Sequence, residues 1–155
     1  ESTQSFMIND IEVTPIPVPH DAREPFQFMF KSNLKSIAII TDLGFITNHI
    51  IKTIKEIKAL VIEFNHDKTM LVDSDYPQSL KNRVAGLYGH LDNMESIKLL
   101  KSINYEGINW IAAAHLSEKN NDDTLVRRLI SEATLKDSES IKVIDQMNGI
   151  DWLNV

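Results

Sequence analysis

The stretch Ile37-Ala38-Ile39-Ile40-Thr41-Asp42-Leu43-Gly44 sets the architecture of this chain, because four apolar residues end abruptly in a polar loop. An unbroken apolar run of this length is typical of a strand that is buried on both faces. Isoleucines at helical spacing follow between residues 50 and 57, and Thr47 or Asn48 is placed to cap that helix. Strand, loop and helix in this order indicate an α/β protein.

The same signals extend outward in both directions. Upstream, apolar residues alternate with polar ones over residues 6–18 and again over residues 26–30. Pro15 and Pro17 in the first stretch, with Pro19 directly after it, favour an edge strand or a bent strand. Downstream, strand and helix signals continue to alternate. The predicted downstream strands are 60–62, 109–114, 141–144 and 150–155, and the predicted helices are 97–103 and 125–133.

Length, charge and cysteine content limit the possible classes of protein. The 155 residues have the length of one domain, and we treat residues 1–155 as a single domain or as part of one. The formal net charge of -6 argues against a broadly basic surface for nucleic acid, although a local basic groove stays open. Without cysteine there is no disulfide, thiolate metal site or cysteine nucleophile, so histidine, aspartate, glutamate and asparagine are the available ligands. These donors favour hard or borderline metals.

The sequence contains no apolar stretch that is long enough to span a bilayer. Glu1-Ser2-Thr3-Gln4 has neither a basic leader nor an apolar signal core. We therefore expect a soluble, cytoplasmic protein without a membrane partner. The chain starts without methionine, which fits a trimmed or partial chain.

Short polar clusters with histidine or aspartate follow nearly every predicted strand. In α/β folds, binding and catalytic groups gather in such loops, because the strands position them rigidly. We therefore predict one polar site that is assembled from several loops. The clusters are Pro19-His20-Asp21, Thr41-Asp42, Glu63 to Asp67, and His115-Leu116-Ser117.

Three residues are the strongest candidates, and each has a structural alternative. His115 follows a predicted buried strand with Ser117 nearby to orient it, but it could also be a hydrogen-bonded histidine at a strand end. Asp42 follows the most apolar strand, where a carboxylate is costly unless it binds a metal, pairs with a cation or caps the next helix. His90 precedes a predicted helix and is suited to an anion, or it is an ordinary loop histidine.

Two polar clusters allow two interpretations. Residues 63–67 contain a glutamate, an asparagine, a histidine and an aspartate, and residues 120–123 read Asn-Asn-Asp-Asp. Either cluster could bind a cation. Either could equally form turns, because asparagine and aspartate side chains bond to their own backbone.

Taken in order, five clusters resemble the second half of metallo-β-lactamase-fold hydrolases of the WalJ/YycJ-like, nuclease-type branch. They extend from about His20 to Asn121, and their order is more specific than any single cluster. The clusters are Pro19-His20-Asp21-Ala22-x-Glu24-Pro25, Thr41-Asp42-Leu43-Gly44, Glu63-x-Asn65-His66-Asp67, Tyr76 to Asn93 with Gly89-His90-Leu91, and Ala114-His115-Leu116-Ser117-x-x-Asn120-Asn121.

This resemblance implies a fold, a site and a reaction. The fold would be the C-terminal half of an αββα sandwich, with a mixed sheet and helices on one outer face. Two divalent ions, zinc or manganese, would be held by His20, by Asp42 as a bridge, and by His115. The implied reaction is the cleavage of a phosphodiester, such as that of DNA, by metal-activated water. Asp42 would act in catalysis with His90, which would assist the phosphate or the leaving group. Four further residues would lie around the metal ligands or on the substrate side. They are Glu63, His66, Ser117 and Asn120.

One part of the family pattern is absent. The His-x-His-x-Asp-His motif, which supplies most metal ligands in the family, does not occur in the 155 residues. We expect that an N-terminal half was removed, lies on another chain or was lost, and removal is simplest because the start methionine is missing. We therefore expect the chain alone to be inactive and to associate with a complementary half through an apolar sheet face.

Two other functions stay open at this point. One is a small-molecule phosphodiester or ester hydrolase of the same fold, for which an acidic surface is no handicap. The other is a non-catalytic binding or scaffold domain. The presence of His20, Asp42 and His115 argues against the second, because a decayed site has no physical need for them.

Overall fold

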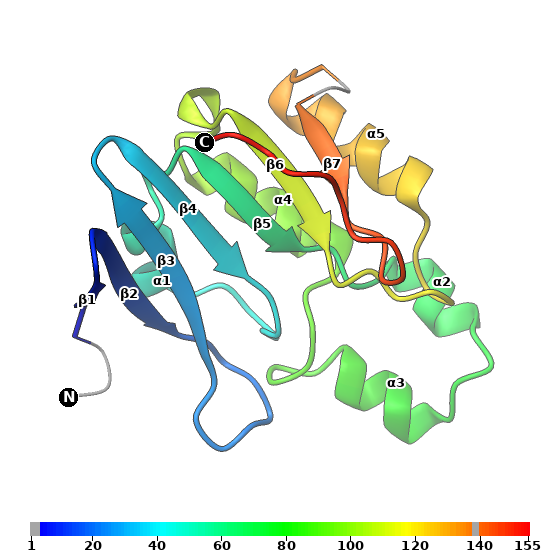
Figure 1. Ribbon diagram of the computed structural model, residues 1–155. Coiled ribbons are helices and arrows are strands. Elements are labelled where there is room, and N and C mark those ends of the chain that lie inside the picture. The colour runs from blue at the N-terminus through cyan, green and yellow to red at the C-terminus, as the bar shows by residue number, and fades with distance from the viewer. Residues whose placement is uncertain (1–3, 138–139) are drawn as a thin grey trace.

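A computed structural model describes residues 4–137 and 140–155 of the chain. The first three residues of the N-terminal stretch Glu1-Ser2-Thr3-Gln4, in which we expected no signal sequence, lie outside the described part. Seven strands form one sheet whose spatial order is the order of the sequence (Figure 1). The strands are β1 (Phe6–Ile8), β2 (Ile11–Pro17), β3 (Phe26–Ser32), β4 (Lys35–Ile40), β5 (Ala59–Glu63), β6 (Trp110–Ala114) and β7 (Ile141–Val143).

The sheet is mixed. Strands β1 to β4 pair antiparallel, whereas β4 to β7 pair parallel. Two antiparallel steps separate β2 from β4, so β2 points in the same direction as the parallel strands. The carboxyl ends of β2, β4, β5 and β6 consequently meet at one edge of the sheet, and their following loops can form a common site.

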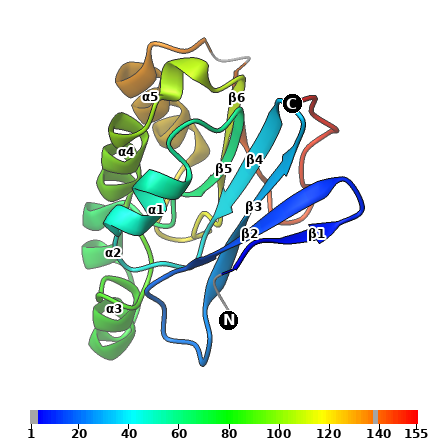
Figure 2. The same cartoon turned by 90° about the vertical axis from the view of Figure 1, so that its left-hand side faces the viewer.

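All the helices lie on one face of the sheet (Figure 2), which confirms the predicted mixed sheet with helices on one outer face. The parallel strands need crossover connections, and the helices provide them. They are α1 (Asn48–Thr53), α2 (Lys68–Asp73), α3 (Gln78–Val84), α4 (Asn93–Ser102), the 3₁₀ turn η1 (Tyr105–Gly107) and α5 (Asp123–Thr134). No helix in the described part of the chain is long and apolar enough to cross a membrane.

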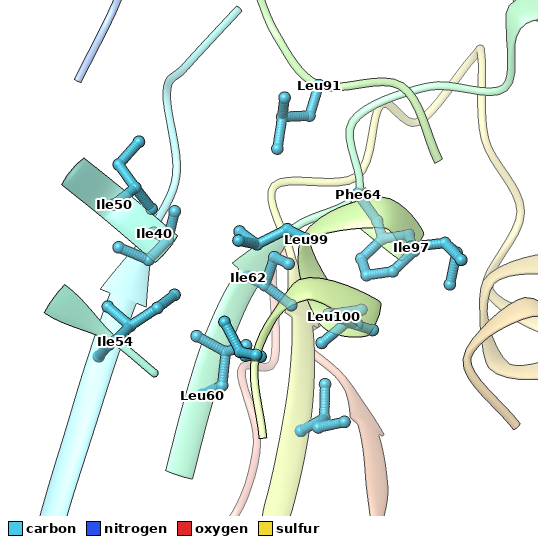
Figure 3. Packing of buried hydrophobic residues seen from close by; sticks show 14 of the residues in the cluster. Ile40, Ile50, Ile54, Leu60, Ile62, Phe64, Leu91, Ile97, Leu99 and Leu100 are labelled. Atoms are coloured by element: carbon cyan, nitrogen blue, oxygen red, sulfur yellow. The ribbon is translucent and has the colours of Figure 1, made fainter. Parts of the chain in front are cut away.

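The main core lies between the sheet and the helices. Strands β4 and β5 contribute fully buried side chains to it, and α1 and α4 cover them (Figure 3). Burial of apolar area is the dominant favourable term in folding, so this layer fixes the strands whose ends position the polar loops. The labelled core residues are Ile40, Ile50, Ile54, Leu60, Ile62, Phe64, Leu91, Ile97, Leu99 and Leu100.

The other face of the sheet is covered less completely. The C-terminal segment packs there, where Leu153 and Val155 contact a small cluster around Trp110 (Figure 2). Towards β3 and β4 the apolar side chains are only half-buried, and they form cross-strand pairs on the same face. These pairs are Phe28 with Ile39 and Phe30 with Ile37.

Several predicted elements differ from the structure. Residues 6–18 form two strands, because Asn9 adopts a left-handed φ of 54° and reverses the chain between β1 and β2. Strand β4 is buried on its helical side, but Ile37 and Ile39 are half-buried on the other. The predicted strand over 150–155 is wrong, since this segment instead lies across the sheet and Asn154 accepts a hydrogen bond from Trp110 through its carbonyl. Helix α1 ends at Thr53, whereas the predicted helix continued to Ile57.

Candidate metal centre

Five polar side chains, four from separate loops and one from the end of a strand, converge at the carboxyl edge of the sheet. His20 follows β2, Asp42 follows β4, Glu63 ends β5, His115 follows β6, and His90 comes from the loop between α3 and α4. Neighbouring imidazole rings are in edge contact, with centroids 5.1 Å apart for His20 and His90 and 5.0 Å apart for His90 and His115. Polar residues that were expected to share one site therefore lie together in a compact cluster.

The backbone turns sharply at two of these residues. Asp42 has a φ of 56° and His115 a φ of 58°, a left-handed conformation that non-glycine residues adopt only at a cost. In both cases the residue is the first or second after a parallel strand. Helix α1 is capped by Thr47, whose hydroxyl accepts a hydrogen bond from the N–H of Ile50, so Asp42 is not needed as a helix cap.

Asp42 lies among the three histidines. Its Oδ1 is 3.7 Å from Nε2 of His20, 3.6 Å from Nδ1 of His115 and 3.9 Å from Nδ1 of His90. The side chain is 39% exposed, so it remains accessible to a ligand. His20 is itself held through Nδ1, which lies 3.1 Å from the carbonyl oxygen of Gly89.

Glu63 is fully buried beneath the cluster, and both of its oxygens have partners. Its Oε1 lies 2.7 Å from Nδ1 of His115 and 2.8 Å from Nδ1 of His90. Its Oε2 accepts hydrogen bonds from the backbone N–H groups of Leu91 and Leu43, at 3.1 and 3.4 Å. An ionised carboxylate can only accept, so both rings present Nδ1–H to it and keep Nε2 as the free lone pair.

The charges at this site are set by the same contacts. Burial raises the pKa of the Glu63 carboxyl, but the hydrogen bonds from His115 and His90 outweigh that effect and hold the pKa below its ordinary value. The hydrogen bond to Glu63 raises the pKa of His115 above its ordinary value, against the opposing effect of burial. Glu63 is therefore an anion that positions two imidazole rings and stabilises positive charge beside it.

The donor set fits a divalent metal ion. Possible ligand atoms of Asp42, Glu63, His90 and His115 all lie within 4.8 Å of one another, and Nε2 of His20 lies beside Asp42. Imidazole nitrogen and carboxylate oxygen suit zinc and manganese. Because both oxygens of Glu63 already accept hydrogen bonds, we interpret Glu63 as the carboxylate that orients the histidine ligands.

The structure separates the predicted site residues into two groups. His20, Asp42, His90 and His115 form the cluster with Glu63. The other three predicted residues bond within the neighbouring loops. His66 is buried with Nδ1 3.3 Å from Oδ1 of Asn65, while the hydroxyl of Ser117 accepts a hydrogen bond from the N–H of Asn120, whose own carbonyl accepts one from Asp67.

The two polar clusters at 63–67 and 120–123 are used mainly for turns and caps. Asp67 caps α2 by accepting from two backbone N–H groups, and Asp122 caps α5. Asn121 forms reciprocal amide hydrogen bonds of 2.9 Å with Asn93, and its Nδ2 also donates to the carbonyl of Phe64. We did not predict this buried amide pair, because a contact between positions 28 residues apart leaves no local sequence signal.

A surface ion pair adjoins the cluster and was also not predicted. Nε of Arg83 lies 2.6 Å from Oδ2 of Asp21, and Oδ1 of the same aspartate lies 3.6 Å from Nε2 of His20. The hydrogen bond with Arg83 lowers the pKa of Asp21. The pair ties α3 to the loop after β2.

Comparisons with known proteins are consistent with this geometry. No family model matches the chain. The exodeoxyribonuclease YycJ of Bacillus anthracis is 37% identical over 123 residues, which are 79% of this chain and 47% of that protein. The exodeoxyribonuclease WalJ of Streptococcus pneumoniae is 30% identical over 112 residues, which are 72% of this chain and 42% of that protein. The chain thus spans about half the length of the curated relatives it matches.

Solved structures show the same fold at low sequence identity. The metallo-β-lactamase fold protein YhfI of Bacillus subtilis matches with a TM-score of 0.71 at 13% identity, over 98% of this chain and 53% of that chain. Zn²⁺-bound PqqB of Methylobacterium extorquens matches with a TM-score of 0.64 at 17% identity, over 97% and 54%. The fold and the histidine cluster define a protein of the metallo-β-lactamase fold. Within that class, the chain belongs to the WalJ/YycJ-like branch.

Proposed function

We propose that this chain is part of a divalent-metal-dependent phosphodiesterase that acts on DNA as an exonuclease. The observation that supports this most directly is the cluster of His20, Asp42, His90 and His115 in a chain whose curated relatives are exodeoxyribonucleases. The cluster combines a bridging-type carboxylate with imidazole donors, which is the chemistry that phosphodiester hydrolysis with metal assistance requires.

In this proposal His20, Asp42 and His115 hold the metal. A bound divalent ion would supply an activated water at neutral pH and would offset charge on the phosphate in the transition state. His90 adjoins the ligands and hydrogen-bonds to Glu63 through Nδ1. In its protonated form it would donate the proton on Nε2 to the departing oxygen. Glu63 keeps His90 and His115 in one tautomer and one orientation.

We also propose that ligands from a complementary half complete the site. The chain spans about half of its curated relatives, and Phe28, Phe30, Ile37 and Ile39 leave an apolar sheet face half-buried. Such a face is typical of a surface that another layer covers. The complementary half can belong to the same gene product or to another chain.

The test uses the natural gene product that contains this chain. We would measure its bound metal by elemental analysis, and nucleotide release from DNA with blocked and free ends. The variant His115→Asn retains a residue type that tolerates the left-handed backbone. It should lose metal and activity together, while His49→Asn, at an exposed position on α1, should lose neither. A wild-type protein that binds no divalent metal would refute the proposal.

A small-molecule phosphodiesterase is the second candidate, because the net charge of -6 opposes a polyanionic substrate. Salt dependence separates the two candidates. Binding to DNA through several phosphates should weaken steeply as the salt concentration rises. A small diester with one phosphate should show a shallow dependence.

A further inference from the structure

A pocket of about 360 Å³ opens directly beside the histidine cluster. One wall comes from the segment around α3, with Tyr76, Leu80 and Val84, and the opposite wall comes from the loop after β6. His90 and His115 also line the pocket, so a molecule bound here would adjoin the groups that we assign to the metal. None of the roles assigned so far explains this space.

The size of the pocket limits its occupant. Pockets that bind small ligands have volumes of about 300 to 1,000 Å³, so this one lies at the lower end. It has room for one sugar and base, but not for two consecutive nucleotides. Most of the lining side chains are polar, and Tyr76, Leu80, Val84 and Leu116 supply the apolar part, so the pocket suits a partly polar ligand.

An aromatic ring is available in this pocket for stacking. Tyr76 is half-buried, and Nζ of Lys119 lies 5.7 Å from the centroid of its ring. Lys119 is exposed, and a cation–π contact at an exposed site is weak. A nucleobase can therefore replace the ammonium group on the Tyr76 ring, because base–aromatic stacking is stronger than an exposed cation–π contact.

One cation and one carboxylate line the pocket. Among the described residues that line it, Lys119 is the one lysine or arginine, and Glu118 is the one aspartate or glutamate. Because the contact of Lys119 with Tyr76 is weak, its ammonium group can leave the ring and bind a phosphate oxygen of a ligand in the pocket. Asn120 also lines the pocket, and its buried Oδ1 has no hydrogen-bond partner among the described residues.

The hollow on the other side of His90 is less suitable. It has a volume of about 160 Å³ and is lined by Asp21, Arg83 and Gly89 among others. Arg83 is already paired with Asp21 there, and among the described residues no tyrosine, phenylalanine or tryptophan lines the hollow. A nucleoside therefore fits the Tyr76 side of His90 better.

We propose that the pocket between Tyr76 and Lys119 binds the nucleoside unit next to the phosphate at the histidine cluster, with its base stacked on Tyr76. This inference rests on the proposed function and deepens it, because it makes recognition of a base part of the site. The substrate class is then a polynucleotide end or a nucleotide ester, and a phosphodiester without a base is a poor ligand.

The experiment compares two ligands that differ only in the base. Calorimetry on the natural gene product would measure binding of deoxyadenosine 5′-monophosphate and of deoxyribose 5-phosphate. We expect the nucleotide to bind about tenfold more tightly, as stacking on one aromatic ring allows. Tyr76→Leu should abolish this preference and leave the affinity for deoxyribose 5-phosphate unchanged, which also shows that the variant is folded. Tyr76→Phe should keep the preference.

The lysine is tested separately. Lys119→Gln should weaken both ligands by a similar factor of about three to ten, because both ligands have the phosphate. Lys101→Gln, at an exposed position on α4, is the matched control and should change neither affinity. An unchanged affinity in Lys119→Gln would overturn the role of the lysine.

The outcomes separate this pocket from the proposed function. Equal affinity of the wild type for the two ligands, or a preference that survives in Tyr76→Leu, overturns the pocket even if the protein degrades DNA. A Tyr76-dependent preference in a protein that cleaves no phosphodiester supports the nucleoside pocket and overturns the nuclease proposal. If neither preference nor cleavage is found, both are overturned.

Discussion

The loops after β4 and β5 both place a carboxylate at the same edge of the sheet, yet the two carboxylates differ in almost every respect. Asp42 in the first loop is 39% exposed, accepts one hydrogen bond of 3.3 Å from the Thr41 hydroxyl, and has imidazole nitrogens at 3.6 Å or more. Glu63 at the second is fully buried and accepts four hydrogen bonds. An accessible carboxylate with loose contacts suits an incoming ligand, while a buried one with all its contacts made suits a fixed support.

The surroundings of the two loops differ in the same way. The loop after β5 is held by buried polar groups, including the carbonyl of Phe64, which accepts from Asn121. In the loop after β4, the N–H groups of Leu43 and Gly44 donate to Glu63 and to the carbonyl of Pro19. The Asp42 side chain itself accepts one hydrogen bond, of 3.3 Å from Thr41, and its backbone is left-handed. We therefore expect substitutions at Glu63 and in the loop after β5 to lower the free energy of unfolding, and substitution of Asp42 in the loop after β4 to affect metal binding.

The largest expected effect is the loss of stability on substitution of the buried carboxylate, Glu63. Glu63→Ala removes the acceptor of two backbone N–H groups and two imidazole rings, so the free energy of unfolding should fall by about 3 to 5 kcal/mol. Urea denaturation would measure it. Glu63→Gln, which keeps the shape, should cost about 1 to 3 kcal/mol. A loss below about 1 kcal/mol for the alanine variant would contradict the supporting role of this residue.

Substitution of the accessible carboxylate, Asp42, should lower metal affinity and leave stability nearly unchanged. Asp42→Asn retains the shape and the tolerance for a positive φ, so the free energy of unfolding should change by no more than about 0.5 kcal/mol. Metal affinity should nevertheless fall more than about 100-fold, because a ligand charge is lost. A metal titration beside a denaturation curve checks both. Unchanged metal affinity would remove Asp42 from the ligand set.

The buried amide pair allows a smaller test. Asn121→Ala leaves the amide of Asn93 and the carbonyl of Phe64 buried without their partner, which should cost about 1 to 3 kcal/mol of unfolding free energy. Thr41→Val in the other loop is the matched control and should cost less than about 1 kcal/mol, since its hydroxyl is half-buried. An equal loss of unfolding free energy in the two variants would contradict the difference that we infer between the two loops.

The smallest effect is a pH dependence of the loop after β5. Burial lowers the pKa of His66, although Asp92 and Glu63 oppose the shift. The unfolded state then takes up protons first as the pH falls, so the stabilisation from neutral His66 is complete above about pH 6.5 and declines at lower pH. Urea midpoints between pH 7.5 and pH 5 should fall less in His66→Gln than in the wild type. An identical decline in both proteins would refute this.

Much of this architecture could be predicted from the sequence. The apolar runs around Ile39, Val61 and Ala112 became β4, β5 and β6, because long apolar segments have to be buried whatever surrounds them. The cap of α1 was also a local property, and Thr47 caps this helix as its position indicated. The strand predicted over 150–155 failed because apolar residues can cover a sheet without pairing with it.

The candidate site was predicted in part. His20, Asp42 and His115 were chosen because each follows a strand, and the parallel arrangement brings these positions to one edge. Their roles as metal ligands remain a proposal. The sequence did not indicate that Glu63 would contact both His90 and His115, since these contacts bridge 27 and 52 positions.

The sequence by itself determined the main strands and most of the longer helices, which polar residues follow the strands, and the family that their order resembles. These properties depend on apolar periodicity and on residue type, which are local. Only the tertiary structure decided that Glu63 is buried and Asp42 accessible, and that Tyr76 and Lys119 enclose a pocket. The physical reason is that burial and through-space contact depend on how distant segments pack, and no local pattern records that packing.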